Sequence, residues 1–312
     1  MKKLFIPMLI LSVVTAGCIR KEIRERLKEA QPIMVKNNID LEDFWSKLEG
    51  DSGLHHLTVE EEYDEVCIRD GFQVSFNQIS DSNRYSFVGS REAYKALDFE
   101  VRDRVLYIGF KEGTHLSDHY SWIGIEKKIK PKRISLSDNS SATGCIDMGD
   151  EDFTLSLKNN SDWICHIKAK NLKVECTNNS NFECAMDVES LSLSVTKNSE
   201  ANLKGDAKCM DLKVLHNSNV SAPWLDTETA WVHLAKNCNA TISCNKNLSG
   251  IVRDGSHLKF FGECIHNDLE AKGSYGEIEQ LPDSMKSQCS KNLSMSSSYT
   301  YSDGKLTKVE IK

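Results

Sequence analysis

The sequence predicts an all-β protein whose main domain, residues 57–282, is a parallel β-helix (a β-solenoid) with about 18–20 residues in each coil. Three observations support this fold. A small residue, usually serine, returns every 18 to 20 residues, an asparagine or glycine stands directly before it, and apolar residues alternate on both sides of it. The chain has 312 residues, 39% of them hydrophobic, which is enough to bury a core of this size.

Residues 1–18 have the pattern of an export signal. Lys2 and Lys3 precede an apolar run at 4–14, and a small-residue cleavage site, Thr-Ala-Gly-Cys, ends at Cys18. The apolar run is too short to span a bilayer. We therefore expect a lipoprotein signal peptide and lipidation of Cys18 after cleavage. An ordinary signal peptide or a short membrane anchor is the alternative.

The net charge limits the partners of the chain. With 39 Lys and Arg against 46 Asp and Glu, the formal charge is −7, and we expect no nucleic-acid binding. Removal of Lys2 and Lys3 takes the charge from −7 to −9, which an anionic membrane surface repels. Membrane attachment therefore has to come from the lipid anchor at Cys18.

Residues 19–56 are predicted to form a tether and a short amphipathic helix. Pro32 ends a charged stretch at 21–30. Asp40 and Gly50 suit the two caps of a helix whose apolar residues fall at helical spacing, namely Leu41, Phe44, Trp45 and Leu48. We expect this N-terminal helix to cover an open end of the solenoid. Docking on a partner protein is the alternative.

Residues 57–110 show the period-two alternation of half-buried strands. Two short apolar runs lie on either side of Asp70-Gly71, which suits a hairpin or the turn of a coil. Two more runs follow at 97–101 and 105–110. This region is therefore expected to be all-β.

The repeated corner is the strongest signal in the sequence. Its small residue is found at Ser141, Ser161, Ser180, Ser199, Ser218, Cys238, Ser256 and Ser274. From the second corner onward the residue before it is Asn160, Asn179, Asn198, Asn217, Asn237, Gly255 and Gly273. Asn and Gly adopt positive φ most readily, so we expect a left-handed bend in every coil. Stacked coils would join these asparagines in a structural ladder, and an asparagine-lined ligand groove is the alternative.

Apolar columns flank the corner. Two residues after it stand Trp163, Phe182 and Val220, and four residues after it stand Cys165 and Cys184. Alternation on both sides of the corner excludes a helical repeat, because it places nothing on one helical face.

The cysteine count suits an exported chain. Of the 11 cysteines, ten remain besides Cys18. We expect Cys145, Cys165 and Cys184 to form one inward column of free thiols, because in-register side chains point alike and disulfide geometry is hard to reach. A Cys238–Cys244 disulfide, or a partner for Cys209, stays open.

The closing coils carry a family resemblance. Residues 254–262, Asp-Gly-Ser-His-Leu-Lys-Phe-Phe-Gly, and 272–276, Lys-Gly-Ser-Tyr-Gly, resemble the putative auto-transporter adhesin, head GIN domain family. That family usually has Gly-Ser at each corner, whereas the first six corners here use asparagine. The resemblance covers 57–282. It implies a right-handed parallel β-helix that is exported, membrane-anchored and without known catalytic activity.

Catalytic and metal-binding patterns are weak. Gly149-Asp150-Glu151-Asp152 is interpreted as a solvated acidic turn. His115 and His119 form an i, i+4 pair with Asp118 between them, but they lie in a loop-like stretch with no further metal ligand in sequence. We therefore predict no catalytic residues, no metal and no cofactor. A polysaccharide lyase or hydrolase with several carboxylates on one solenoid face is the rival hypothesis.

The remaining prediction concerns the C-terminus and the function. Residues 283–312 are expected to form a hairpin that caps the last coil or pairs with another protomer. Together the patterns favour an exported lipoprotein on the bacterial envelope, at the outer membrane or cell surface, that acts as a non-catalytic binding or adhesion module. Expected partners are the membrane, through the anchor, and a glycan or surface-protein ligand, with self-association as a further expectation. A structural or partner-docking envelope protein is the other alternative.

Overall fold

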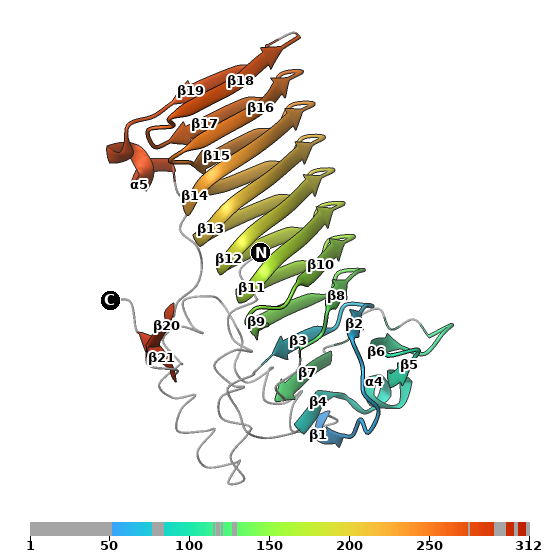
Figure 1. Ribbon diagram of the computed structural model, residues 1–312. Coiled ribbons are helices and arrows are strands. Elements are labelled where there is room, and N and C mark those ends of the chain that lie inside the picture. The colour runs from blue at the N-terminus through green and yellow to red at the C-terminus, as the bar shows by residue number, and fades with distance from the viewer. Residues whose placement is uncertain are drawn as a thin grey trace.

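The computed structural model describes residues 52–76, 84–114, 116, 119, 121–126, 130–273, 275–289, 298–302 and 305–309. Nineteen strands form one continuous sheet that winds into a stack of coils, and two more form a separate pair (Figure 1). The predicted β-solenoid is therefore confirmed, and its handedness stays a prediction. Cys18 and the predicted N-terminal helix lie outside the described residues.

The central coils are the most regular part of the molecule. Their strands are β10 (Phe153–Lys158), β11 (Asp162–Thr177), β12 (Asn181–Thr196), β13 (Glu200–Leu215) and β14 (Asn219–Ala235). Each long strand pairs in parallel with the next. The offset is 19 residues, as from Cys165 to Cys184, and it becomes 20 between β13 and β14 after an irregularity between Asn202 and Lys204. Buried and outward residues alternate along them, as period-two patterning requires.

The first coils are not stacked in chain order. They are built from β2 (Glu65–Ile68), β3 (Gln73–Phe76), β6 (Val105–Phe110), β7 (Ser121–Glu126), β8 (Arg133–Leu136) and β9 (Ser141–Asp147). The coil of β2 and β3 lies between the coil of β6 and β7 and that of β8 and β9, in parallel with both. Asp70-Gly71, with φ values of 63° and 77°, is therefore the corner of a coil and not a hairpin turn.

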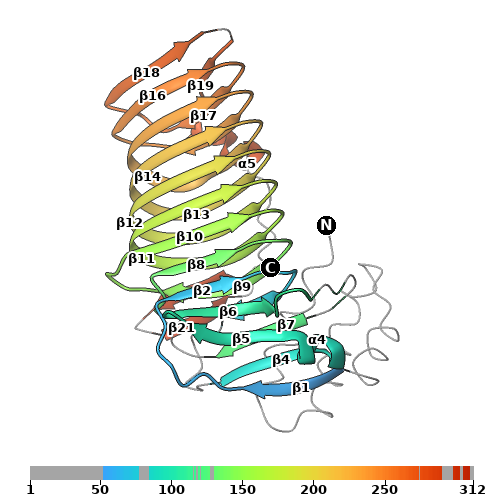
Figure 2. The same cartoon turned by 90° about the vertical axis from the view of Figure 1, so that its right-hand side faces the viewer.

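Antiparallel strands close this end of the stack. They are β1 (Ser52–Leu57), β4 (Arg84–Ser90) and β5 (Leu97–Arg102), with the helix α4 (Arg91–Ala96) between β4 and β5. β5 pairs with β6, β4 pairs with β7, and β1 pairs with β4 (Figure 2). These antiparallel partners occupy the edges that the first parallel coil would otherwise leave open.

The opposite end has shorter elements. They are β15 (Asn239–Ser243), β16 (Asn247–Arg253), β17 (His257–Phe261), β18 (His266–Lys272), β19 (Glu277–Gln280), the 3-10 helix η1 (Asp283–Met285) and α5 (Lys286–Cys289). β15 pairs with β17, which pairs with β19, and β16 pairs with β18. β20 (Ser298–Ser302) and β21 (Lys305–Val309) pair with each other in a separate antiparallel sheet, and the capping role of this hairpin stays a prediction.

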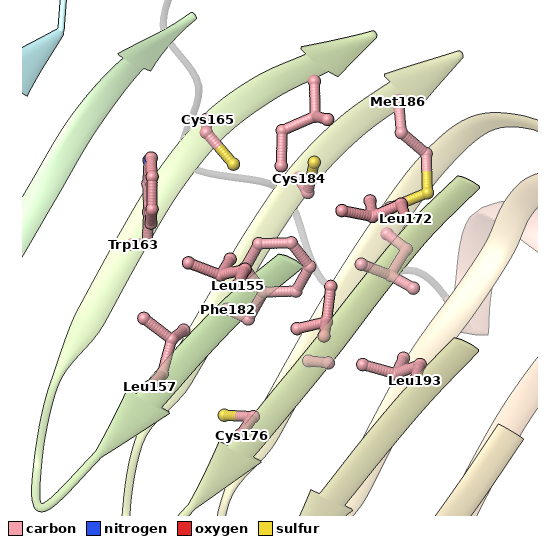
Figure 3. Packing of buried hydrophobic residues seen from close by; sticks show 14 of the residues in the cluster. Leu155, Leu157, Trp163, Cys165, Leu172, Cys176, Phe182, Cys184, Met186 and Leu193 are labelled. Atoms are coloured by element: carbon pink, nitrogen blue, oxygen red, sulfur yellow. The ribbon is translucent and has the colours of Figure 1, made fainter. Parts of the chain in front are cut away.

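The core is a continuous apolar column inside the stack. Trp163, Phe182, Cys165 and Cys184 point inward from successive rungs, and Leu155, Leu157 and Leu172 belong to the same buried cluster (Figure 3). Side chains from both walls interdigitate, so the interior is filled and not a pore. In the part of the chain that the structure describes, no helix is long and apolar enough to cross a membrane.

One predicted register is wrong at the first corner. Ser141 pairs with Asp162, so Ser140 and not Ser141 takes the corner position of Ser161. The extra residue shifts everything after it by one place. As a result Cys145 pairs with His166, and Gly144 takes the column position that Cys145 was expected to share with Cys165.

Candidate functional site

Each corner consists of two successive residues with positive φ. Asn159 and Asn160 have φ values of 57° and 63°, and Asn178 and Asn179 have 60° and 61°. In the predicted column, Asn160, Asn179, Asn198, Asn217, Asn237 and Gly255 all have positive φ. Gly273 has positive φ too, but Lys272 pairs with Arg253 and Glu277 with His257. Gly273 is therefore level with Asp254 and not with Gly255, and the predicted register of the last corner is wrong. A second column directly before it has the same conformation and contains Asp138, Asn159, Asn178, Lys197, His216, Lys236 and Asp254.

A buried serine follows the two bent residues and links neighbouring coils. Ser161 donates its hydroxyl to the Lys158 carbonyl of its own coil at 2.6 Å. Its backbone N–H donates to Ser180 Oγ of the next coil at 3.2 Å. Ser180 repeats the pattern with Ser199. Because a buried hydroxyl and a backbone N–H both need partners, this bond explains why the corner residue is small and polar.

The asparagine side chains form two parallel ladders on the surface. In the predicted column, Asn179 Nδ2 donates to Asn160 Oδ1 at 3.2 Å, and Asn237 donates to Asn217 at 3.5 Å. In the second column, Asn178 Nδ2 donates to Asn159 Oδ1 at 2.9 Å. This second ladder was not predicted, although the Asn-Asn pairs at two successive corners indicate it.

The doubled ladder borders an open polar groove. The groove has a volume of about 360 Å³ and is lined by Asn159, Asn160, Asn178, Asn179, Lys197 and Asn198. An amide group has two N–H donors and an oxygen with two lone pairs, and a ladder bond uses one of each. The remaining donors and acceptors can hydrogen-bond a polar ligand. The lining consists of five asparagines and one lysine, Lys197, and contains no carboxylate.

Two exposed tryptophans lie elsewhere on β14. Trp231 is 43% exposed and lies between Asp211 and Ser249 of the neighbouring coils. Trp224 is 48% exposed, with Lys286 Nζ of α5 placed 5.9 Å from its ring centroid. Large exposed aromatic rings are enriched where proteins bind partners. Neither tryptophan was predicted as a site residue, although the alternation with buried neighbours places both on outward faces.

A row of three carboxylates runs along the outside of the central coils. Asp187, Asp206 and Asp226 pair in register on β12, β13 and β14, and all three are exposed. A general acid or base is usually shielded from water, because burial shifts its pKa toward the working range. This row therefore lacks one feature of a catalytic centre.

The sequence motifs considered for metal binding have structural partners. In the acidic turn, Glu151 accepts a hydrogen bond from Lys130 Nζ at 2.9 Å. His119 Nδ1 is 3.0 Å from Ser121 Oγ, its ring packs on Phe72 and Phe110, and burial lowers its pKa. His115 and Asp118 lie outside the described residues. Among the described residues, no group of three or more His, Cys, Asp or Glu is placed to hold a metal ion.

Comparison with known proteins relates this chain to bacterial proteins. The family model for "Putative auto-transporter adhesin, head GIN domain" matches residues 62–264. A crystal structure of a putative adhesin from Parabacteroides merdae is similar, with a TM-score of 0.63, 14% identity, and coverage of 75% of this chain and 97% of that one. None of the curated proteins matches the chain.

Two further solved structures share the fold. A putative adhesin from Parabacteroides distasonis has a TM-score of 0.60 and 16% identity, and covers 75% of this chain and 98% of its own. A putative lipid binding protein from the same species has a TM-score of 0.58 and 14% identity, with the same coverage. At these identities the likeness concerns the fold.

Proposed function

Because the chain belongs to the putative auto-transporter adhesin, head GIN domain family, we propose that it is a non-catalytic binding module on the bacterial envelope. A lipid anchor on Cys18 holds it there after removal of the signal peptide, residues 1–18, and residues 19–56 tether the solenoid. The ligand is a glycan or a surface protein. The observation that carries this proposal is a stack of coils that presents repeated polar groups at its corners and exposed aromatic rings on another face.

The geometry supports binding through many weak contacts. The doubled ladder offers amide groups at the spacing of neighbouring strands, about 4.8 Å. Such a row can engage an extended polar ligand at several points at once, which raises the overall affinity without any single strong contact. Trp231 adds an apolar surface on another face of the same coils.

A binding array on the purified protein starting at Ile19 tests this function. Glycans, extracellular-matrix proteins and lipid vesicles are presented together, because one structural relative is described as a putative lipid binding protein. We expect retention on glycans or matrix proteins, weakened by Asn179→Ala or Trp231→Ala. If neither variant loses binding, the ligand contacts another part of the surface. If the chain is retained on no glycan and no protein, the proposal is contradicted.

The anchor has a test of its own. Cells grown with a labelled fatty acid should transfer the label to the full-length chain, and Cys18→Ala should abolish the transfer. Protease added to intact cells should degrade the chain if it is displayed on the outer surface. A processed, unlabelled pool in the periplasm would contradict the lipid anchor while leaving the binding function open to the array.

The exposed carboxylate row favours one second candidate, a polysaccharide-active lyase or hydrolase. Asp187, Asp206 and Asp226 form the cluster on a single face that such an enzyme needs. Sugar-release assays on the glycans that bind will distinguish the two functions. Release of unsaturated or reducing ends that Asp206→Ala abolishes would establish the enzyme, whereas binding without release supports the adhesion module.

Self-association is the remaining partner proposal. Of the strands that the structure describes, β18 pairs only with β16 and β19 only with β17, so each has an edge free for another strand. Sedimentation of the purified protein over a range of concentrations should then reveal a dimer or larger assembly.

A further inference from the structure

Cys244 and Cys264 lie on stacked loops near the C-terminal end of the solenoid. Cys244 directly follows β15, and Cys264 lies in the loop between β17 and β18. Because β15 pairs with β17 and β16 pairs with β18, the two loops run side by side. The Cys244 N–H donates to the Phe261 carbonyl at 3.0 Å, and this bond fixes the start of the loop after β15 on the end of β17.

The two cysteines are in direct contact. The Cys264 thiol donates to the Cys244 carbonyl at 3.2 Å. Between them lies Gly262, with φ of 100°, where an added Cβ would come within 2.3 Å of the same carbonyl oxygen. Glycine is therefore needed for the loops to approach this closely. Burial raises the pKa of the Cys264 thiol to about 11, and the adjacent Cys244 thiol contributes to the increase.

This pair differs from the cysteines of the core. Cys165 and Cys184 are both buried on neighbouring rungs of one column (Figure 3). In the loop pair, Cys244 is buried, whereas Cys264 is partly exposed and leads the chain from one coil to the next. A reagent in solution can therefore reach Cys264 first, and the buried Cys244 is adjacent to Cys264 in the interior.

We propose that Cys244 and Cys264 form a disulfide when the protein meets a disulfide oxidant outside the cytosol. The thiolate of Cys264 attacks one sulfur of the oxidant and displaces its other sulfur as a thiolate. The thiolate of Cys244 then attacks Sγ of Cys264 and displaces the second thiolate of the oxidant. Two protons leave the protein thiols, two electrons reduce the oxidant, and one Sγ–Sγ bond joins the loops.

The disulfide fastens the loop that leads into the last coil, which contains Cys264, to the loop one coil earlier, which contains Cys244. It closes a ring of 20 residue steps, from 244 to 264, around one complete turn of the solenoid. The strand beyond the ring, β18, is mostly exposed, and Ile265 next to Cys264 is 72% exposed. A terminal coil with so little buried surface is the one that opens most easily, so a covalent link there stabilises the stack where packing is weakest.

Oxidation of the purified protein with oxidised glutathione tests the disulfide. After acid quenching, denaturation and alkylation, we expect two fewer alkylated cysteines and a peptide in which Cys244 is linked to Cys264. Reductant should then lower the Tm of the oxidised protein by about 5 °C. Cys264→Ser should abolish both the linked peptide and the response to reductant, and Cys209→Ser, which removes an exposed cysteine, should change neither.

The proposal does not depend on the ligand or on the anchor. The linked peptide is detected in the wild-type chain, so the result stands even where a variant fails to fold. A stable glutathione adduct on Cys264, a different linked pair, or full alkylation of both cysteines would each overturn it. A linked peptide together with failure on the binding array would contradict the proposed function alone.

Discussion

At the end of the solenoid nearer the N-terminus, β5 and β4 pair in antiparallel fashion with β6 and β7 and cover the first coil. At the other end, the described residues place no strand on the outer edges of β18 and β19, and Tyr275 is 83% exposed. A parallel coil can be extended by any strand of matching register, whereas an antiparallel partner that bends away ends the stack. Among the described strands, growth of the stack is therefore blocked at one end, whereas the outer edges of β18 and β19 have no partner at the other.

The two ends also differ in what holds them together. The closed end depends on particular side-chain contacts, such as the stacking of His55 on Tyr94 at 3.6 Å between ring centroids. The coils depend on columns of similar residues, each repeated from rung to rung. A substitution in the coils should therefore act through the neighbouring rungs, and one at the closed end through a local network.

The largest effect is expected at Gly205, in the middle of the stack. Gly205 has φ of 108°, and an added Cβ would lie 2.1 Å from the Met186 carbonyl oxygen on the adjacent rung. Gly205→Ala combines backbone strain with a clash against backbone that cannot move alone, and should cost roughly 4 kcal/mol. Urea unfolding measures this loss.

Gly113 provides the matched control for this change. It also has positive φ, 79°, but nothing lies within 4 Å of the position of an added Cβ. Gly113→Ala should therefore cost only about 1 kcal/mol. Equal losses at the two sites would show that backbone conformation, and not the stacking of rungs, controls the stability of the coils.

The closed end is tested next at Asp98. Its carboxylate is 7% exposed and accepts hydrogen bonds from Arg69 Nη2 at 2.9 Å and Arg102 Nη2 at 2.8 Å. Asp98→Ala leaves the two guanidinium groups without this acceptor, at a cost of about 2 kcal/mol after allowance for their partial exposure. Hydrogen exchange should increase in β5 and β6 and stay unchanged in β12 and β13.

Glu100 is the control at the same end. It is an exposed partner of Arg102, so Glu100→Ala should change the stability by less than about 0.5 kcal/mol. Faster exchange along the whole solenoid in Asp98→Ala would contradict the view that the closed end behaves as a local network.

These differences explain how far the sequence could predict the structure. The coil and its corners were accessible because Asn and Gly share a preference for positive φ and return in phase. Lys197, His216 and Lys236 have no such preference, yet they also have positive φ. Their conformation is imposed by the corners of the neighbouring coils, and the local sequence gives no sign of this constraint.

The order of the first coils was inaccessible for a related reason. Asp70-Gly71 has the residues of a tight turn whether the flanking strands pair with each other or with other coils. The structure places β2 and β3 between coils that come later in the chain, and this choice of partners is non-local. The one-residue error at Ser141 arose in the same way, since Ser140 and Ser141 fit the corner equally well by residue type.

The candidate site offers a smaller test at Asn179. Asn179 has φ of 61° and donates to Asn160. Asn179→Ala loses both the ladder bond and the tolerance of positive φ, and should cost about 1.5 kcal/mol, whereas Asn179→Gly loses only the bond and should cost about 0.5 kcal/mol. Urea midpoints of the two variants separate the contributions. Equal losses would mean that the ladder bond alone stabilises the corner.

The smallest effect is a gain in stability at Asp162, on the outer face of β11. Burial, with a smaller contribution from the nearby Glu183, raises the pKa of this carboxyl to about 6, so the folded protein favours the neutral acid. Stability from this group is present at low pH and is lost as the pH rises through about 6.

Asp162→Asn should therefore stabilise the protein at pH 7.5 and have little effect at pH 4. Asparagine already occupies the paired position, Asn181, on the next rung, so the amide fits the column. We expect a gain of about 1 kcal/mol, which allows for the partial exposure of the group. Asp226→Asn, at an exposed position on the same side of the coils, controls for the loss of one negative charge. An equal gain from both variants, or a gain that does not grow between pH 4 and 7.5, would assign the effect to net charge instead of to burial within the stack.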